Sequence, residues 1–221
     1  MRIYCMSDIH GCLKEFEEAL ALITDRLNDD DTKLVLLGDY IHMGPDSRGV
    51  LDRVIGLQKE YGKDKVIALL GNHEESCISG LTNIDDGNGA IAGDEEYIKW
   101  MRTLPLYWTA GRTIFVHAGI DEEAADLWKV GTADYIFTSK YPAETGEIED
   151  LDMKVVAGHI GTASISGEKD FHGIYHDGSS HYYIDGSVYD SGTIPVLLVD
   201  TDKDKYYSVT ADGKSEIVPY K

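Results

Sequence analysis

Five short apolar runs along the chain each end in a polar motif. The runs cover residues 2–6, 33–37, 65–70, 113–115 and 154–157. Each is short and apolar enough to be a buried strand. In an open α/β sheet, ligands bind in the crevice outside the carboxyl ends of the strands. The pattern therefore predicts five strands that bring polar side chains to one edge of the fold.

Amphipathic segments lie between the first runs. Apolar residues spaced three and four apart form helical stripes over 13–27 and 50–61, and Gly62 ends the second stripe. Asp94 could cap a third helix that carries Tyr97, Met101 and Leu104. Because strands and helices alternate over the first third of the chain, we expect two βαβ units there.

The later part of the chain has a different pattern. Beyond Val155 the helical period fades, and short apolar runs at 182–184, 195–199 and 206–209 are separated by turn residues. This spacing predicts mostly antiparallel sheet. Residues 82–93, which are rich in Gly, Asn and Asp, predict a loop or a mobile cap near the site.

The composition fits a globular α/β protein. The 221 residues are 43% hydrophobic, and we expect a single domain over 1–221. Forty acidic and twenty basic residues give a formal charge of -20, which disfavours extended nucleic acid as a partner. With so few cations, binding of phosphate is expected to need metal ions.

The sequence also bears on location. Three cysteines cannot pair evenly, and no signal peptide precedes the first strand, so we expect a cytoplasmic protein. No apolar run approaches the roughly 18 residues that indicate a membrane-spanning helix, and no membrane association is expected. The oligomeric state is left open.

The polar motifs that follow the five runs are rich in metal-ligating residue types. They read Asp8-Ile9-His10-Gly11, Gly38-Asp39, Gly71-Asn72-His73-Glu74, Val116-His117 and Gly158-His159. Asp8 and His10 can aim a carboxylate and an imidazole at one cation. The two oxygens of Asp39 can bridge a pair of ions about 3.5 to 4 Å apart. The second ion would be completed by Asn72, His117 and His159.

The donor set also indicates the metal and the chemistry. Oxygen and imidazole ligands without thiolate suit Mn²⁺, Fe or Zn²⁺, and we favour manganese. Two such ions lower the pKa of a water molecule and neutralise the oxygens of a phosphate group. His73 lies beside the expected ligand Asn72 and is the natural general acid for the leaving group. Glu74 is expected to have a supporting role.

At these motifs the chain resembles the calcineurin-like metallophosphoesterases, and more closely the bacterial branch of the phosphoprotein phosphatases. Segments 44–52 and 183–189 also look like that branch. The resemblance implies a sandwich of two mixed β-sheets flanked by α-helices. It implies Asp8, His10 and Asp39 on one ion, and Asp39, Asn72, His117 and His159 on the other. His73 carries over as the proton donor.

The chain departs from the family pattern just after Asp39. Where the phosphatases have Asp-Arg-Gly, this chain has His42-Met43-Gly44, so the family's orienting Asp and phosphate-binding Arg are both missing. Losing one donor to the transition state costs about 3 to 4 kcal/mol if nothing replaces it. Arg48, at the start of a predicted helix, is a candidate replacement, as are Lys140 and Arg112. His42 is a candidate substrate-binding or acid–base residue.

Three functions remain open at this point. The leading expectation is a phosphoesterase that acts on a phosphorylated protein or a small phosphoester, most like a Ser/Thr protein phosphatase. The first alternative is hydrolysis of dinucleoside polyphosphates or other nucleotide phosphoesters, which would need an apolar cleft for the base. The aromatic residues are expected to lie mostly in the core, with the alternative that Trp128, Tyr135, Phe137 and Tyr141 form the apolar wall of a substrate cleft. The second alternative is a module that binds phosphorylated ligands without hydrolysing them.

Overall fold

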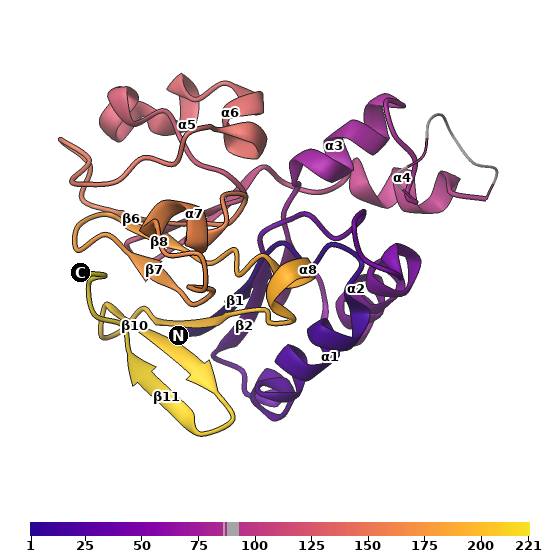
Figure 1. Cartoon of the computed structure of the whole chain (residues 1–221), viewed down its shortest axis with the longest axis horizontal. Coiled ribbons are helices and arrows are strands. Elements are labelled where there is room, and N and C mark those ends of the chain that lie inside the picture. The colour runs from indigo at the N-terminus through magenta and orange to yellow at the C-terminus, as the bar shows by residue number, and fades with distance from the viewer. Residues whose placement is uncertain (86, 88–92) are drawn as a thin grey trace.

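Two mixed β-sheets packed face to face form the centre of the computed structural model (Figure 1). The structure describes residues 1–85, 87 and 93–221; the rest of the predicted 82–93 loop lies outside the described residues. The first sheet has the order β11-β10-β9-β1-β2-β3 and the second the order β4-β5-β6-β8-β7. The strands are β1 (Arg2–Met6), β2 (Thr32–Leu36), β3 (Val66–Ala68), β4 (Tyr107–Ala110), β5 (Thr113–Val116), β6 (Lys154–Ala157), β7 (Tyr175–His176), β8 (His181–Tyr183), β9 (Val196–Asp200), β10 (Lys205–Thr210) and β11 (Gly213–Glu216).

The first third of the chain contains the two predicted βαβ units. β1 pairs with β2 and β2 with β3, both in parallel. The connections carry α1 (Leu13–Ala21) with the 3₁₀ helix η1 (Thr24–Asn28), and α2 (Ser47–Tyr61). The first stripe is therefore not one continuous helix, although Ile23 and Leu27 beyond α1 are still fully buried. Gly62 ends α2 with a positive φ of 91°, as expected for a terminating glycine.

The other helices are short. They are α3 (Asn72–Ser79), α4 (Glu95–Met101), the 3₁₀ helix η2 (Glu122–Leu127), α5 (Trp128–Gly131), α6 (Asp134–Ser139), α7 (Thr162–Ser166) and α8 (Val188–Ser191). The third predicted helix is confirmed as α4, which ends before Leu104. Asp94 precedes it, but its side chain caps no backbone N–H and binds Arg48 instead.

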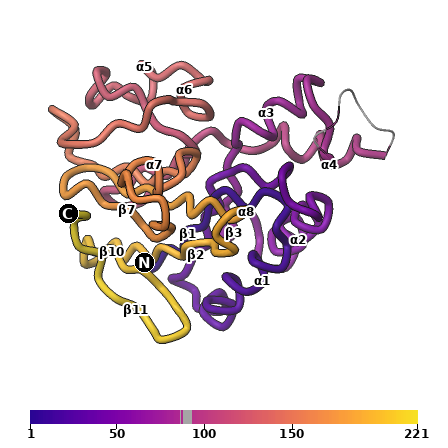
Figure 2. Tube along the Cα trace, in the orientation of Figure 1, coloured from indigo at the N-terminus to yellow at the C-terminus, as the bar shows by residue number. Residues whose placement is uncertain are grey.

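The prediction of mostly antiparallel sheet beyond Val155 is confirmed for β7 with β8 and for the last three strands. β9 runs antiparallel to β1 and β10, and β10 to β11. β8, however, runs parallel to β6. The intervening segment carries α7 and is long enough to cross over the sheet, and an apolar run does not reveal the direction of the strand it forms. Figure 2 shows the C-terminal part (yellow) beside the N-terminal strands (indigo), as the pairing of β9 with β1 requires.

Successive side chains of a strand point to opposite faces of its sheet, so the buried apolar side chains form three layers: one between the sheets and one on the outer face of each sheet. Ile3 and Cys5 of β1 face Phe115 and Val156 across the space between the sheets. Tyr4 and the other outward residues of β1 pack under α1 and α2. A third cluster on the outer face of the second sheet lies under α5 and α6. The sandwich is therefore covered by helices on both sides, as the resemblance implied. Within the described part of the chain, no helix has the length and apolarity needed to cross a membrane.

Candidate metal centre

The carboxyl ends of strands from both sheets meet at one edge of the sandwich. The Asp8 amide donates to the Gly38 carbonyl (3.2 Å), which joins the loops after β1 and β2. The His159 amide donates to the Asp8 carboxylate (3.0 Å), which joins the loops after β6 and β1. A Cβ at Gly158 would lie 2.1 Å from an Asp8 oxygen, so only glycine allows the sheets to approach this closely.

The backbone of this edge is strained at the predicted ligands. Asp8, His10, Asp39 and His159 all have positive φ angles, between 47° and 64°. A non-glycine residue in this conformation costs about 1 to 3 kcal/mol and persists only when its surroundings fix it. Four such residues within one small region indicate that the loops are shaped to aim side chains rather than to maximise stability.

Two imidazoles are oriented by backbone carbonyls. Nδ1 of His10 lies 3.2 Å from the Ile41 carbonyl, and Nδ1 of His117 lies 3.2 Å from the Leu37 carbonyl. Since a carbonyl only accepts, each Nδ1 carries a proton, and Nε2 is the nitrogen that can bind a cation once it has no proton of its own. This is the arrangement by which proteins prepare histidine to bind a metal.

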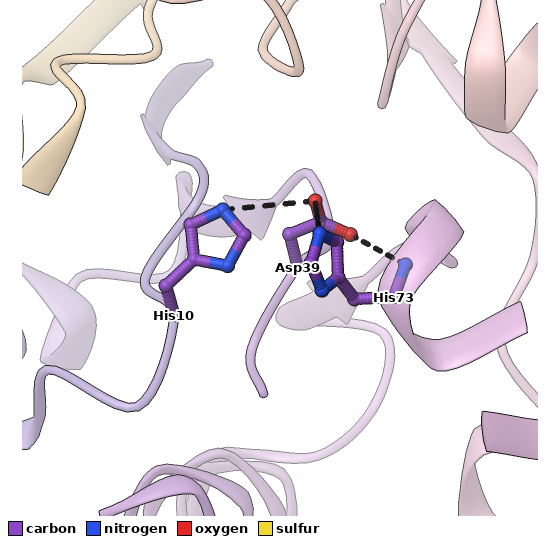
Figure 3. A group of neighbouring side chains, drawn as sticks. All are labelled: His10, Asp39 and His73. Carbon is purple, nitrogen blue, oxygen red and sulfur yellow. Dashed lines mark hydrogen bonds and ion pairs between the residues drawn. The ribbon is translucent and has the colours of Figure 1, made fainter. Parts of the chain in front are cut away.

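Asp39 is the common point of the cluster (Figure 3). Its Oδ2 lies 3.8 Å from Nε2 of His10, 3.8 Å from Nε2 of His73 and 3.4 Å from Nε2 of His117. Its Oδ1 accepts a hydrogen bond from the His73 amide (3.0 Å). Two groups of ligand atoms each fall within 4.8 Å, His10 with Asp39 and His73, and Asp39 with His117 and His159.

The remaining predicted ligands complete both groups. Asp8 Oδ1 lies 3.9 Å from His10 Nε2. Asn72 Oδ1 lies 2.9 Å from His117 Nε2 and 3.0 Å from His159 Nδ1. Asn72 and His73 are held there because the short segment after β3 leads into α3, which begins at Asn72. All six residues predicted as ligands therefore lie together, and His73 lies beside them.

The spacing fits two cations. Donor atoms bound to one ion at about 2.0 to 2.2 Å lie about 3 to 3.5 Å from each other. The distances from Asp39 Oδ2 to the imidazole nitrogens are close to that range, and they are too long for good hydrogen bonds. The contacts of Asn72 Oδ1 are shorter and do have hydrogen-bond length. The donors are carboxylate, amide and imidazole without sulfur, a set that suits Mn²⁺, Fe or Zn²⁺.

Charge is concentrated in this buried cluster. Burial, opposed by His117, raises the pKa of Asp8 to about 6. Burial also acts to raise the pKa of Asp39, but the imidazoles of His117, His73 and His10 outweigh it and lower this pKa. Burial and His117 together lower the pKa of His159 to about 4, so this imidazole is neutral and able to bind a cation.

Glu74 fixes the loop that carries Asp39. Its fully buried carboxylate accepts hydrogen bonds from the amides of Asp39 (2.8 Å), Tyr40 (2.8 Å) and Gly71 (3.1 Å). It therefore ties the loop after β2 to the start of α3, in agreement with the supporting role expected from the sequence.

His42 lies behind His73 and does not line the cavity over the cluster. His42 Nδ1 is 2.7 Å from His73 Nδ1, and His42 Nε2 is 2.6 Å from the Asn83 carbonyl. Because that carbonyl accepts, His42 Nε2 donates and its Nδ1 accepts from His73. Nε2 of His73 then faces the cluster. Asn83 as the partner of His42 is not predictable from sequence, since it lies 41 residues away in a loop.

The basic residues considered as phosphate ligands are all paired elsewhere. Arg48 binds Asp85 and, through Nη2, both oxygens of Asp94 (2.9 and 3.0 Å). Lys140 binds Glu144 and Glu122, and Arg112 pairs with carboxylates at the opposite end of the strands. Substrate binding by Arg48 stays a prediction, and it would require the guanidinium to leave both carboxylates.

A cavity of about 270 Å³ opens over His10, Asp39, Asn72, His73 and His159. Its other lining residues are Met43, Asp185, Ser187, Val188, Tyr189 and Asp190. In the sequence, the segment 183–189 stands out only by its resemblance to the family. A usable signal was present, because Asp185 follows the apolar run 182–184 just as the other polar motifs follow theirs.

The aromatic cluster before Gly146 does not wall this cavity. Trp128 and Phe137 are buried in the core and pack edge-on against each other with Tyr107. Tyr135 and Tyr141 are exposed and line a separate hollow beside Lys140. The expected core position is confirmed for Trp128 and Phe137, and the alternative of an apolar wall formed by these four residues is wrong for this cavity.

The chain matches one protein-family model and is similar in sequence to several curated proteins. The model for calcineurin-like phosphoesterases matches residues 1–191. The symmetrical bis(5′-nucleosyl)-tetraphosphatase of Nitrosospira multiformis is 35% identical over 129 residues, which cover 54% of this chain and 44% of that protein. The chain spans about half the length of the curated relatives it matches.

Solved structures confirm the fold. A cold-active protein tyrosine phosphatase from a psychrophilic Shewanella superposes with a TM-score of 0.66 at 16% identity, covering 98% of this chain and 80% of that one. A structure described as a putative diadenosine tetraphosphatase superposes with a TM-score of 0.62 at 19% identity, covering 94% and 92%. At these identities the similarity concerns the sandwich itself.

Proposed function

Because the chain belongs to the calcineurin-like phosphoesterase family, we propose that it is a two-metal hydrolase that cleaves a dinucleoside polyphosphate or a related nucleotide. The observation that carries the proposal is the position of Asp39, whose Oδ2 lies within 3.4 to 3.8 Å of three imidazole nitrogens and is shared by both ligand groups. The relatives' names match the predicted nucleotide alternative better than the leading expectation of a protein phosphatase.

The six converging residues would hold two divalent ions. Asp8, His10 and Asp39 would bind one, and Asp39, Asn72, His117 and His159 the other, with Mn²⁺ as the metal we propose. When bound, the ions would supply an activated water and neutralise the oxygens of the phosphate under attack. The strained loops and the carbonyl-oriented imidazoles provide these ligands already in place.

His73, as an imidazolium with one proton on Nδ1 and one on Nε2, would donate the Nε2 proton to the leaving oxygen. Its Nε2 faces the cluster, and its Nδ1 is held by His42, so that the ring presents a fixed edge to the substrate. His42 is thus a positioning residue in this proposal. It takes the structural place that the family gives to an aspartate, and it uses the Asn83 carbonyl as its own anchor.

The charge of the cavity does not distinguish a nucleotide from a phosphorylated protein. Of the described residues that line it, none is Lys or Arg, while Asp185 and Asp190 are acidic. The phosphate group of either substrate would have to be attracted by the ions, since both substrates are anionic. The preference for a nucleotide therefore rests on the names of the curated relatives.

Product analysis tests this proposal. The Mn²⁺-loaded protein is incubated with diadenosine tetraphosphate, and nucleotides are separated by anion-exchange chromatography. Symmetrical cleavage, in which water opens the central anhydride, gives two molecules of ADP and no AMP or ATP. Asp39→Asn should abolish the reaction, while Asp212→Asn, in the turn between β10 and β11, should not. Tight binding without products would instead support the non-catalytic alternative.

A further inference from the structure

We propose that Tyr189, together with Met43, forms the surface against which the base of the nucleotide substrate packs. This inference rests on the proposed function in taking a nucleotide as the ligand. It assigns a role in recognising the base to Met43, in the loop after β2, and to Tyr189, in α8.

Both side chains are large, apolar and exposed within the same cavity. Tyr189 is 63% exposed and Met43 is 53% exposed, and both line the cavity that contains Asp39 and His73. Most other exposed large apolar residues of the described chain lie away from this cavity. An aromatic ring and a thioether are the side chains that pack best on the flat face of a base.

The backbone holds both residues in place. Met43 has a φ of 64°, and the amide of the following Gly44 donates to the His10 carbonyl (2.7 Å). Ser187, just before α8, has a φ of 50°, and its amide donates to Asp185 (2.7 Å). Left-handed conformations at non-glycine residues persist only where the surroundings impose them. The backbone positions from which the two side chains project are therefore fixed at the rim.

Size and charge restrict what else this rim can bind. The cavity of about 270 Å³ lies just below the range of about 300 to 1,000 Å³ that encloses a whole drug-sized ligand. It can take a phosphate over the cluster and an adjoining group at the rim. Because Asp190 lies next to Tyr189, that adjoining group must not be anionic, whereas a base offers an apolar face and N–H donors.

Direct binding tests the inference independently of turnover. The dissociation constants of AMP and of ribose 5-phosphate, which lacks the base, are measured by titration calorimetry on the Mn²⁺-loaded protein. We expect AMP to bind about 5- to 150-fold more tightly, the ratio that corresponds to base stacking of about 1 to 3 kcal/mol at 1.4 kcal/mol per tenfold change. In Tyr189→Ala this ratio should fall close to one, and in Tyr189→Phe it should be retained.

Tyr135→Ala is the matched control, since Tyr135 is 64% exposed but lies outside the cavity; it should leave the ratio unchanged. The inference is overturned if AMP and ribose 5-phosphate bind equally to the parent protein, or if Tyr189→Ala weakens both equally. A parent protein that prefers AMP but does not cleave diadenosine tetraphosphate would reject the proposed substrate and keep the base-binding role.

Discussion

Replacing His42 with alanine should impair catalysis selectively for substrates whose leaving group needs a proton. His42 is buried, and its ring joins His73 Nδ1 to the Asn83 carbonyl through contacts of 2.7 and 2.6 Å. In His42→Ala, His73 loses the side chain that holds its Nδ1, and the ring can rotate away from the substrate.

The expected fall in kcat for His42→Ala follows from the loss of the contact with His73. A general acid contributes about 10²- to 10⁴-fold to the rate. With three χ1 wells and two ring orientations available, an unheld imidazole is in the productive orientation about one time in six. Adding the loss of one buried hydrogen bond, about 1 kcal/mol, we expect kcat to fall about 10- to 100-fold with little change in KM. The unpaired Asn83 carbonyl should also lower stability by about 1 to 3 kcal/mol.

The assay compares phenyl phosphate with 4-nitrophenyl phosphate, whose phenolate leaves without help from an acid. We expect the full loss in kcat for the first substrate and a much smaller loss for the second. The double variant His42→Ala/His73→Asn should be no slower than His73→Asn, because the two histidines act as one unit. His176→Ala, which removes another buried imidazole remote from the cavity, controls for loss of stability.

An equal loss on both phenyl phosphates would refute the reasoning, because it would show that His42 acts on the fold or the ion site rather than on proton transfer. Additive losses in the double variant would do the same.

Three further predictions concern stability, pH and specificity. Glu74→Gln should lower the free energy of unfolding by about 1 to 3 kcal/mol, measured by urea denaturation, because an amide cannot accept from all the backbone N–H groups that Glu74 binds. Burial acts to lower the pKa of His181, but its bonds to Asp177 and Glu122 outweigh this and raise the pKa to about 9. The unfolded value is about 6.5, so a stabilisation of about 3 kcal/mol should be present below pH 6.5 and lost as the pH rises through 9, a fall that thermal unfolding of His181→Gln should not show. Met43→Arg should place a cation at the cavity and lower KM for phenyl phosphate about tenfold while reducing the preference for AMP over ribose 5-phosphate.

For each of these three predictions, one result would contradict the reasoning. Unchanged stability in Glu74→Gln would mean that its carboxylate does not organise the Asp39 loop. A parallel decline of parent and His181→Gln with pH would assign the effect to other groups. An unchanged KM in Met43→Arg would show that this side chain does not reach the phosphate.

Much of the site could be predicted from sequence because its residues follow strands. Asp8, Asp39 and His117 each come directly after an apolar run, and parallel strands that end at one edge must bring such residues together. The same logic identifies the five strands. It does not give the direction of β8, which depends on a crossover connection that apolar runs do not encode.

The parts that could not be predicted depend on contacts between distant loops. Arg48 was a candidate for phosphate binding, but its partner Asp94 lies 46 residues away, and pairing at that separation leaves no local pattern. The contact between His42 and Asn83 is of the same kind. Tyr189 lines the cavity only because α8 follows β8 to the edge where the other strands end.

The number of metal ions bound per chain tests the central claim most directly. The protein is stripped with chelator, equilibrated with Mn²⁺ by dialysis, and analysed for bound metal and protein concentration. The account predicts two ions per chain, and loss of at least one in Asp39→Asn, because Asp39 serves both ligand groups. A single ion in the parent protein, or two ions retained with unchanged affinity in Asp39→Asn, would contradict it.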